Sequence, residues 1–178
     1  LLAARLIKEN GIKLRTSSMC FLPGETIEMG FETLWLNKEM KVNYAWMYPL
    51  QPYPGTEIYQ YAVDNGFLDK EFSFDNIDPL GILESPLERK LKDGKKLKVL
   101  HRLFYYGIKI PGFVYLLKLL VHLPNNFVFE LLHRFSLLIN YARFHEINLF
   151  HAFMIASRVV LTERRLRISI KAEDIRKA

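Results

Sequence analysis

The first third of the chain alternates between the apolar periods of helices and strands. Residues 1–10 have helical spacing. Residues 12–22 predict a strand, because Ile12 and Leu14 alternate with polar residues and 19–22 are continuously apolar. A continuous apolar run is typical of parallel strands, so we expect this strand to be buried on both faces.

A second strand and two more helices follow in the same region. Residues 26–40 have helical spacing, 42–48 predict a strand, and 57–65 predict a helix with Thr56 as its N-cap. A helix between two strands indicates a crossover and a parallel sheet. Two strands cannot bury both faces of a sheet, so we expect further strands upstream of Leu1, in a longer parent protein.

The rest of the chain carries helical signals. We divide it into a barrel-like part at 1–68, a connector at 69–90 and an all-α region at 91–178. The helices of that region are expected at 97–106, 112–123, 127–144 and 148–163. One face of the third is apolar, with Phe127, Leu131, Phe135, Leu138 and Ala142. Both tryptophans, Trp35 and Trp46, are expected in the core.

Charge is distributed unevenly between the two halves. Residues 1–89 hold 8 Lys and Arg against 13 Asp and Glu, whereas residues 90–178 hold 17 against 6. Such asymmetry suggests regions with different partners. Five lysines between Lys90 and Lys98 are read first as solvated surface and second as peripheral contact with anionic lipid headgroups. No motif indicates nucleic acid as a partner.

Cysteine and histidine usage predicts no metal site. Cys20 is the single cysteine, so the chain forms no internal disulfide and cannot hold a cluster alone, which favours a reducing, cytoplasmic location. His145-Glu146 begins like a zinc-protease motif, but Leu149 stands where the second histidine belongs.

Two turns that follow the predicted strands are the features of the sequence that say most about function. Their sequences are Phe21-Leu22-Pro23-Gly24-Glu25-Thr26 and, about 30 residues later, Gln51-Pro52-Tyr53-Pro54-Gly55-Thr56. They resemble the turns after the fifth and sixth strands of radical S-adenosylmethionine (radical SAM) barrels. Leu36-Asn37 and Tyr44-Ala45-Trp46 resemble the subfamily with an N-terminal cobalamin-binding domain. The resemblance covers 1–68 and implies the last two βα units of a partial (β/α)6 TIM-like barrel, within an α/β fold.

The resemblance also implies a chemistry for the parent enzyme. Such enzymes use a [4Fe–4S] cluster to cleave S-adenosylmethionine into a 5′-deoxyadenosyl radical that abstracts a substrate hydrogen. With cobalamin the expected outcome is methyl transfer to an unactivated carbon, and ring formation by a cyclase or rearrangement are the alternatives, on a small-molecule or lipid-like substrate. The family's Cys-x-x-x-Cys-x-x-Cys loop is absent here. We therefore expect the cluster ligands and any cobalamin domain upstream, no catalytic residue in this chain, and no activity from it alone.

The family places the adenine of S-adenosylmethionine against the ends of these strands. By that resemblance its contacts would be Cys20, Leu22, Pro23, Gly24, Glu25, the backbone near Tyr48, Pro49 and Leu50, and Gln51, with Tyr53 facing substrate. Two of these residues also have a structural interpretation. Cys20 can act as a small buried hydrophobic residue, and Glu25 can stabilise the start of a helix.

One residue departs from the family pattern. Many members have glycine where this chain has Phe21, whose ring either narrows the adenine site or points between strand and helix. The competing hypothesis for the whole chain is a non-catalytic helical module that docks on a membrane surface or a protein partner.

Overall fold

The computed structural model describes residues 1–69, 72 and 83–158. The chain divides into two compact units, Leu1–His133 and Arg134–Ala178, and each is described by itself. Most of the predicted connector and the end of the predicted helix 148–163 lie outside the described residues.

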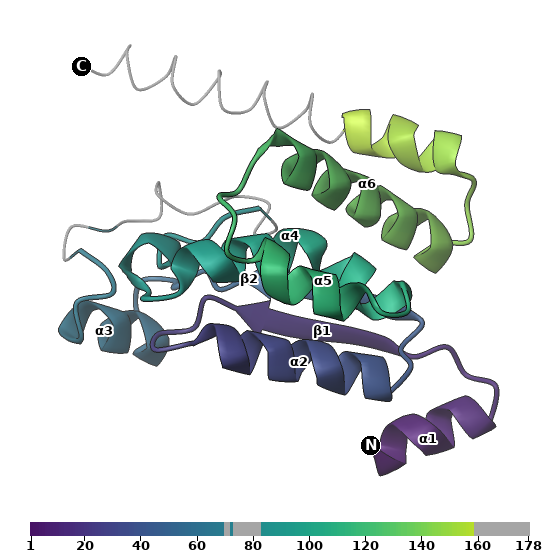
Figure 1. Ribbon diagram of the computed structural model, residues 1–178, viewed down its shortest axis with the longest axis horizontal. Helices are drawn as coiled ribbons and strands as arrows, with labels where there is room; N and C mark the ends of the chain where they lie inside the picture. Colours follow the sequence, from purple (N-terminus) through teal and green to yellow (C-terminus); the bar gives the residue numbers. More distant parts are fainter. Residues whose placement is uncertain (70–71, 73–82, 159–178) are drawn as a thin grey trace. The chain divides into compact units, whose positions relative to one another are not determined.

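The first unit opens with alternating helices and strands (Figure 1). In chain order they are α1 (Leu2–Glu9), β1 (Arg15–Cys20), α2 (Ile27–Glu39), β2 (Tyr44–Pro49) and α3 (Glu57–Asp64). The two strands pair in parallel, with Arg15 opposite Tyr44 and Cys20 opposite Pro49. This confirms the α/β class. The sheet within the described residues has these two strands, which form no barrel by themselves.

Side-chain caps start both helices that follow a strand. Thr26 accepts a hydrogen bond from the Met29 N–H at the start of α2, over 3.4 Å. Thr56 accepts one from the Tyr59 N–H at the start of α3, also over 3.4 Å, which confirms the predicted cap. Each hydroxyl satisfies a donor that the first helical turn leaves unpaired.

The first strand begins later than predicted, at Arg15 instead of residue 12. The reason is local, because the side chain of Asn43 replaces a ladder partner just before the strand. Its Oδ1 accepts the Leu14 N–H at 2.9 Å, while the Leu14 carbonyl accepts the Asn43 N–H at 2.9 Å.

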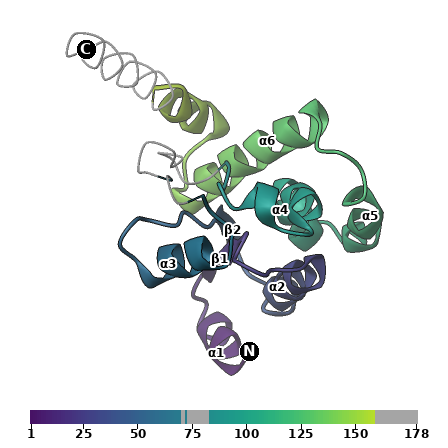
Figure 2. The same cartoon turned by 90° about the vertical axis from the view of Figure 1, so that its left-hand side faces the viewer.

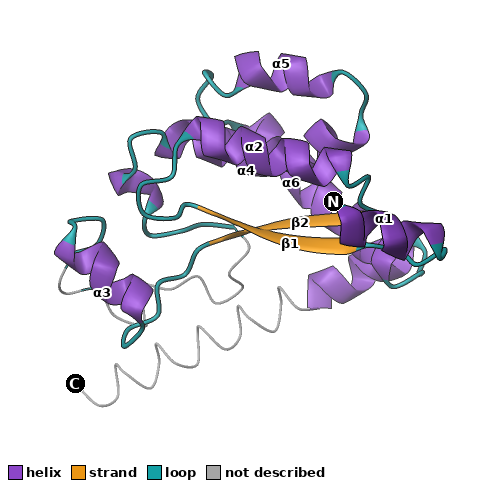
Figure 3. Cartoon of the chain, turned by 90° about the horizontal axis from the view of Figure 1, so that it is seen from below, coloured by secondary structure: helices purple, strands orange, loops and turns teal. Residues whose placement is uncertain are grey.

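The prediction that this strand is buried on both faces is wrong. Alternate residues of β1 are exposed, and Met19 retains 55% of its surface. The helices α2 and α4 (Gly94–Lys109) lie on one side of the two strands (Figures 2 and 3). In the described part of the chain the opposite sheet face, which carries the exposed residues of β1, is open. The continuously apolar sequence at 19–22 gave no sign of this difference between the two faces.

Two glycines allow the helices above the sheet to approach closely. A Cβ on Gly30 of α2 would lie 2.6 Å from Leu100 Cδ2, and one on Gly107 of α4 would lie 2.7 Å from Leu34 Cδ1. Neither distance is possible for a real side chain without a shift. The resulting core includes Leu34, Leu97, Leu100, Leu103 and Leu117, all fully buried.

The remaining elements are helical, as predicted. The short 3-10 helix η2 (Glu88–Lys90) precedes α4, and α5 (Phe113–Leu120) packs on α4. Helix α6 (Phe127–Phe144) has the predicted bounds; it starts in the first unit and continues into the second, where residues 149–158 are also helical. Among the described residues, we find no helix with the length and apolar character needed to cross a bilayer.

Candidate functional site

The two motif turns leave the sheet at the same edge. In the parallel register Cys20 lies opposite Pro49, and the Leu50 N–H extends the ladder by donating to the Cys20 carbonyl at 2.9 Å. The first turn therefore starts beside the second, although 28 residues separate Cys20 from Tyr48. In parallel α/β folds this edge is where loops meet ligands.

The first turn is held by its own glutamate. The Glu25 carboxylate is buried and accepts the Leu22 N–H at 3.0 Å. Burial raises the pKa of Glu25, and backbone hydrogen bonds from Leu22 and Phe21 oppose that rise. Gly24 has a φ of 81°, a left-handed conformation that glycine adopts without strain. The carboxylate thus faces into the turn, whereas Leu22 and Gly24 are exposed.

Phe21 also adopts a left-handed backbone, with a φ of 62°. This region disfavours side chains with a Cβ, so the backbone of Phe21 is strained. The ring is buried and meets His101 of α4 edge-on, with centroids 6.1 Å apart. The sequence allowed this ring either to narrow the proposed adenine site or to point between strand and helix, and in the structure it packs on helix α4.

Cys20 is a buried thiol. Its Sγ donates to the Tyr48 carbonyl at 3.6 Å. Burial raises the pKa of Cys20 well above the ordinary value, Glu25 adds to the rise, and Arg102 opposes it. A protonated, enclosed sulfur of this kind acts as a small hydrophobe. Among the described residues no group of three or more His, Cys, Asp and Glu side chains could hold a metal ion.

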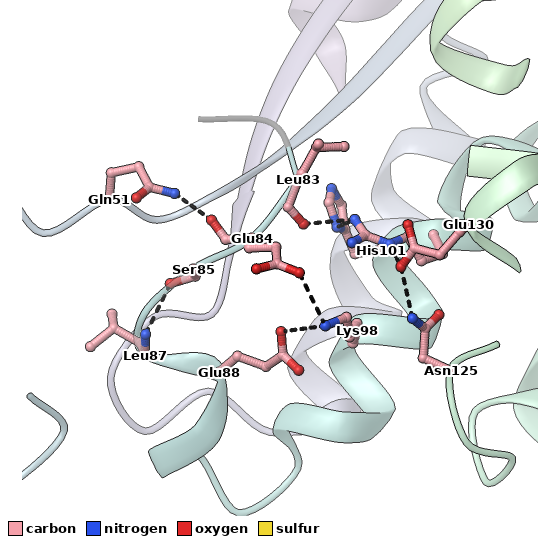
Figure 4. Close-up of polar contacts among 11 residues, drawn as sticks. Gln51, Leu83, Glu84, Ser85, Leu87, Glu88, Lys98, His101, Asn125 and Glu130 are labelled. Carbon is pink, nitrogen blue, oxygen red and sulfur yellow. Dashed lines mark hydrogen bonds and ion pairs between the residues drawn. The ribbon is translucent and has the colours of Figure 1, made fainter. Parts of the chain in front are cut away.

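The second turn is covered by residues 84–85 and contains one buried polar atom without a partner in the described part of the chain. Pro49 is buried and the Leu50 carbonyl accepts the Ser85 hydroxyl at 2.7 Å, so the strand end is closed by residues 84–85. Gln51 Nε2 donates to the Glu84 carbonyl (Figure 4). Gln51 Oε1 is buried and has no hydrogen-bond partner among the described residues. A buried amide oxygen without a donor is unfavourable, and a ligand N–H would satisfy it.

Tyr48 and Tyr53 lie on different surfaces. Tyr48 belongs to the open sheet face, where its ring stacks on Trp46 with centroids 6.1 Å apart and an interplanar angle of 5°. The Arg15 guanidinium lies 5.5 Å from the Trp46 centroid, and its Nη2 donates to the Tyr48 hydroxyl at 3.3 Å. Tyr53 is exposed in the following loop.

Sequence reasoning missed this cationic and aromatic platform. Trp46 was expected in the core, yet it is only partly buried, and Trp35 is exposed as well. The sequence of β1 gave no signal for this surface, because the exposed positions include apolar Met19 and the alternate positions include polar Thr16 and Ser18.

A second polar cluster, also missed, centres on Arg102. Figure 4 labels its members Leu83, His101, Asn125 and Glu130. Arg102 is 1% exposed, and its Nε donates to Glu130 at 2.8 Å while Nη1 donates to the Leu83 carbonyl at 2.7 Å. Asn125 Nδ2 also donates to Glu130, at 2.7 Å. Arg102 thereby joins α4, the start of α6 and the segment that covers Leu50.

His101 completes this cluster from the sheet side. Its Nε2 lies 3.1 Å from the Met47 carbonyl, which can only accept, so we assign the proton to Nε2. Its Nδ1 lies 3.1 Å from Arg102 Nη1 and accepts from it. Burial lowers the pKa of His101 well below its ordinary value, and the neighbouring His133 and Arg102 lower it further. His101 is therefore neutral.

Comparison of the chain with protein-family models, with curated proteins and with solved structures gave no match.

Proposed function

We propose that residues 1–68 are the last two βα units of a radical SAM barrel and that the strand edge at Leu22 and Gln51 contacts the adenine of S-adenosylmethionine. The observation that carries this proposal is the common edge of the two motif turns, fixed by the register of Cys20 with Pro49. The left-handed Phe21, at a position where the family favours glycine, is a second point of support.

Two kinds of group at the strand edge support adenine binding, one buried and one exposed. Gln51 Oε1 is a buried acceptor without a donor in the described part of the chain, and an exocyclic amine would satisfy it. Leu22 and Gly24 are exposed beside it, and a glycine lets a ligand approach the backbone. Tyr48 and the stacked Trp46 would face the substrate from the open side of the sheet.

Other residues would act indirectly. Cys20, Glu25 and Pro49 are buried, and the first two bond within the protein, so we assign them to holding the turns in place. The Leu50 N–H donates to the Cys20 carbonyl, and the Leu50 carbonyl accepts the Ser85 hydroxyl. The second lone pair of the Leu50 carbonyl is therefore the backbone group of this residue that remains for a ligand.

The described residues do not fit an iron–sulfur cluster, because their one cysteine is a buried, protonated thiol. We derive no step through that group, and the proposal places its ligands, and any cobalamin domain, in another part of the enzyme. S-adenosylmethionine supplies the radical chemistry when bound, with methyl transfer or ring formation as the proposed outcome. The part of this chain would be to orient the adenine and to shield the reacting atoms.

Isothermal titration with S-adenosylhomocysteine, an unreactive analogue, tests the binding edge. We expect Gln51→Leu to weaken binding about tenfold or more, because an unsatisfied polar group costs roughly 1–3 kcal/mol. Gln60→Leu is the matched control, since the Gln60 side chain is exposed on α3 and donates to Asp64 of the same helix. Equal affinity for the wild-type and Gln51→Leu chains would refute the assignment.

A further inference from the structure

A short segment covers the second motif turn, and we call its residues, 83–86, the strap. The Ser85 hydroxyl donates to the Leu50 carbonyl at 2.7 Å. The Glu84 carbonyl accepts the side-chain amide of Gln51 (Figure 4). These two bonds join the strap to the strand edge, so departure of the strap would uncover the turn.

The two ends of the strap are held differently. At its C-terminal end, Leu87 is fully buried in a small apolar cluster with Ala62 and Leu68. At its N-terminal end, the Leu83 carbonyl accepts Arg102 Nη1 at 2.7 Å. Apolar burial at the first end does not depend on pH, whereas the contact at the second end depends on the position of one guanidinium group.

His101 helps to fix that guanidinium group. Its Nδ1 accepts from the same Arg102 Nη1 over 3.1 Å, because its Nε2 carries the proton that meets the Met47 carbonyl. A proton added to Nδ1 would oppose two donors 3.1 Å apart on two positively charged groups. Protonation of His101 therefore repels Arg102 from the position in which it holds the Leu83 carbonyl.

His101 has further basic neighbours on its own helix and on α6. Arg102 and Lys98 belong to α4, and their charges oppose a charge on His101. Helix α6 contributes His133, whose ring centroid lies 4.7 Å from that of His101. A proton on either histidine disfavours a proton on the other. Protonation is therefore unfavourable while these groups are packed together.

The carboxylates near this histidine are engaged elsewhere. Glu130 of α6 pairs with Arg102 at 2.8 Å, and Lys98 lies 3.7 Å from Glu84 and 3.1 Å from Glu88. The first turn meets the imidazole with an aromatic ring, and its buried carboxylate is bonded inside the turn. Among the described residues none of these carboxylates bonds to the imidazole, so a charge there would be unbalanced.

We propose that the pair of His101 and Arg102 is an acid-sensitive latch on the strap. Protonation of His101 displaces Arg102, the Leu83 carbonyl loses its donor, and residues 83–86 leave the second turn. Leu87 and the leucine core of α2, α4 and α5 stay in place, so the opening is local. The latch acts whatever the second turn binds, and it does not depend on the adenine assignment.

Acid favours the open form because an exposed histidine binds a proton more readily than a buried one. The pKa of His101 in the closed form is lowered well below its ordinary value, first of all by burial. Below about pH 6.5 opening therefore takes up a proton, and the open population rises by at most about tenfold per pH unit. The strap is closed above that pH and opens progressively below it.

Amide hydrogen exchange of the ¹⁵N-labelled full chain, followed by NMR from pH 7 to pH 5, tests the latch. Two reporter amides lose their acceptors when Ser85 moves. The Leu87 N–H donates to Ser85 Oγ at 3.2 Å, and the Glu88 N–H donates to the Ser85 carbonyl at 3.3 Å. Protection is measured relative to the unfolded chain at the same pH, which removes the intrinsic pH dependence of exchange.

We expect protection of the two reporter amides to fall about tenfold or more from pH 7 to pH 5. Low urea should leave this protection unchanged, because a local opening exposes little surface, whereas urea lowers the protection of amides that exchange by global unfolding, as expected inside α2. His101→Gln removes the titrating ring and should make reporter protection independent of pH. His122→Gln, which changes an exposed histidine, is the matched control and should behave as the wild type.

The wild type alone can overturn the proposal. Reporter protection that stays constant from pH 7 to pH 5, or that falls with urea as steeply as protection inside α2, would show that no local opening occurs. Loss of the pH dependence in His133→Gln but not in His101→Gln would place the titration on the other histidine, and would also overturn it.

Discussion

Arg102 and Glu130 form an ion pair in which the guanidinium is 1% exposed and the carboxylate 27%. Burial raises the pKa of Glu130, but hydrogen bonds from Asn125 and Arg102 and the charge of Arg102 outweigh it, so the pKa lies below its usual value. The same arginine also holds the Leu83 carbonyl. The pair thus connects α4 to the start of α6 and to the segment that covers the strand edge.

Removal of one member of this pair should destabilise the first unit. Glu130→Ala leaves the Arg102 charge buried without a partner, and we expect a loss of about 3 kcal/mol in the free energy of unfolding. Glu84→Ala removes an exposed partner of Lys98 and should cost less than about 1 kcal/mol. Urea titrations measure both. If Glu130→Ala lowered the free energy of unfolding as little as Glu84→Ala does, the ion pair would not stabilise the first unit.

Replacement of both partners should cost less than loss of one. In Arg102→Met with Glu130→Leu no charge remains buried, so we expect the double variant to be more stable than Glu130→Ala by about 1 kcal/mol or more. Urea titration of the two variants side by side gives this difference. The opposite order would show that the polar network itself is required for folding.

His101 should make stability depend on pH. Because its pKa in the folded chain is lowered, the unfolded chain binds more protons below about pH 6.5, and stability falls as the pH drops through that value. For one such group the free energy of unfolding changes by at most about 1.4 kcal/mol per pH unit. His101→Gln keeps a donor for the Met47 carbonyl and should flatten the decline between pH 7 and 5, whereas exposed His122→Gln should not.

Two variants of Phe21 separate the stability gained from packing its ring from the stability lost to its strained backbone. Phe21→Gly relieves the left-handed backbone but loses a buried ring, and we expect a net loss of about 2 kcal/mol or more. Phe21→Ala loses the ring and keeps the strain, so it should be less stable than Phe21→Gly by about 0.5–1 kcal/mol. Thermal or urea unfolding of the two variants measures this order. An alanine variant more stable than the glycine variant would exclude strain at this position.

Local sequence signals predicted much of the fold. The Thr56 cap and the bounds of α6 followed from residue type and spacing. The parallel strands followed from the order of elements. These features depend on neighbours in the chain, so periodicity was sufficient to find them.

The polar contacts of the site depend on residues far apart in the sequence and were not predictable. Arg102 lies 28 positions from Glu130 and 19 from Leu83, and no local pattern links them. The direction of the apolar face of α6 was not predictable either. Spacing shows that Phe127 and Leu131 share a face but not whether that face meets protein or solvent.

The radical SAM assignment is tested most directly by NMR, through titration of the ¹⁵N-labelled chain with S-adenosylhomocysteine. The account predicts saturable chemical-shift changes at the amides of Leu22, Gly24 and Leu50 and at the side-chain amide of Gln51, with none on α5. No change at this edge, or changes confined to other parts of the chain, would contradict it.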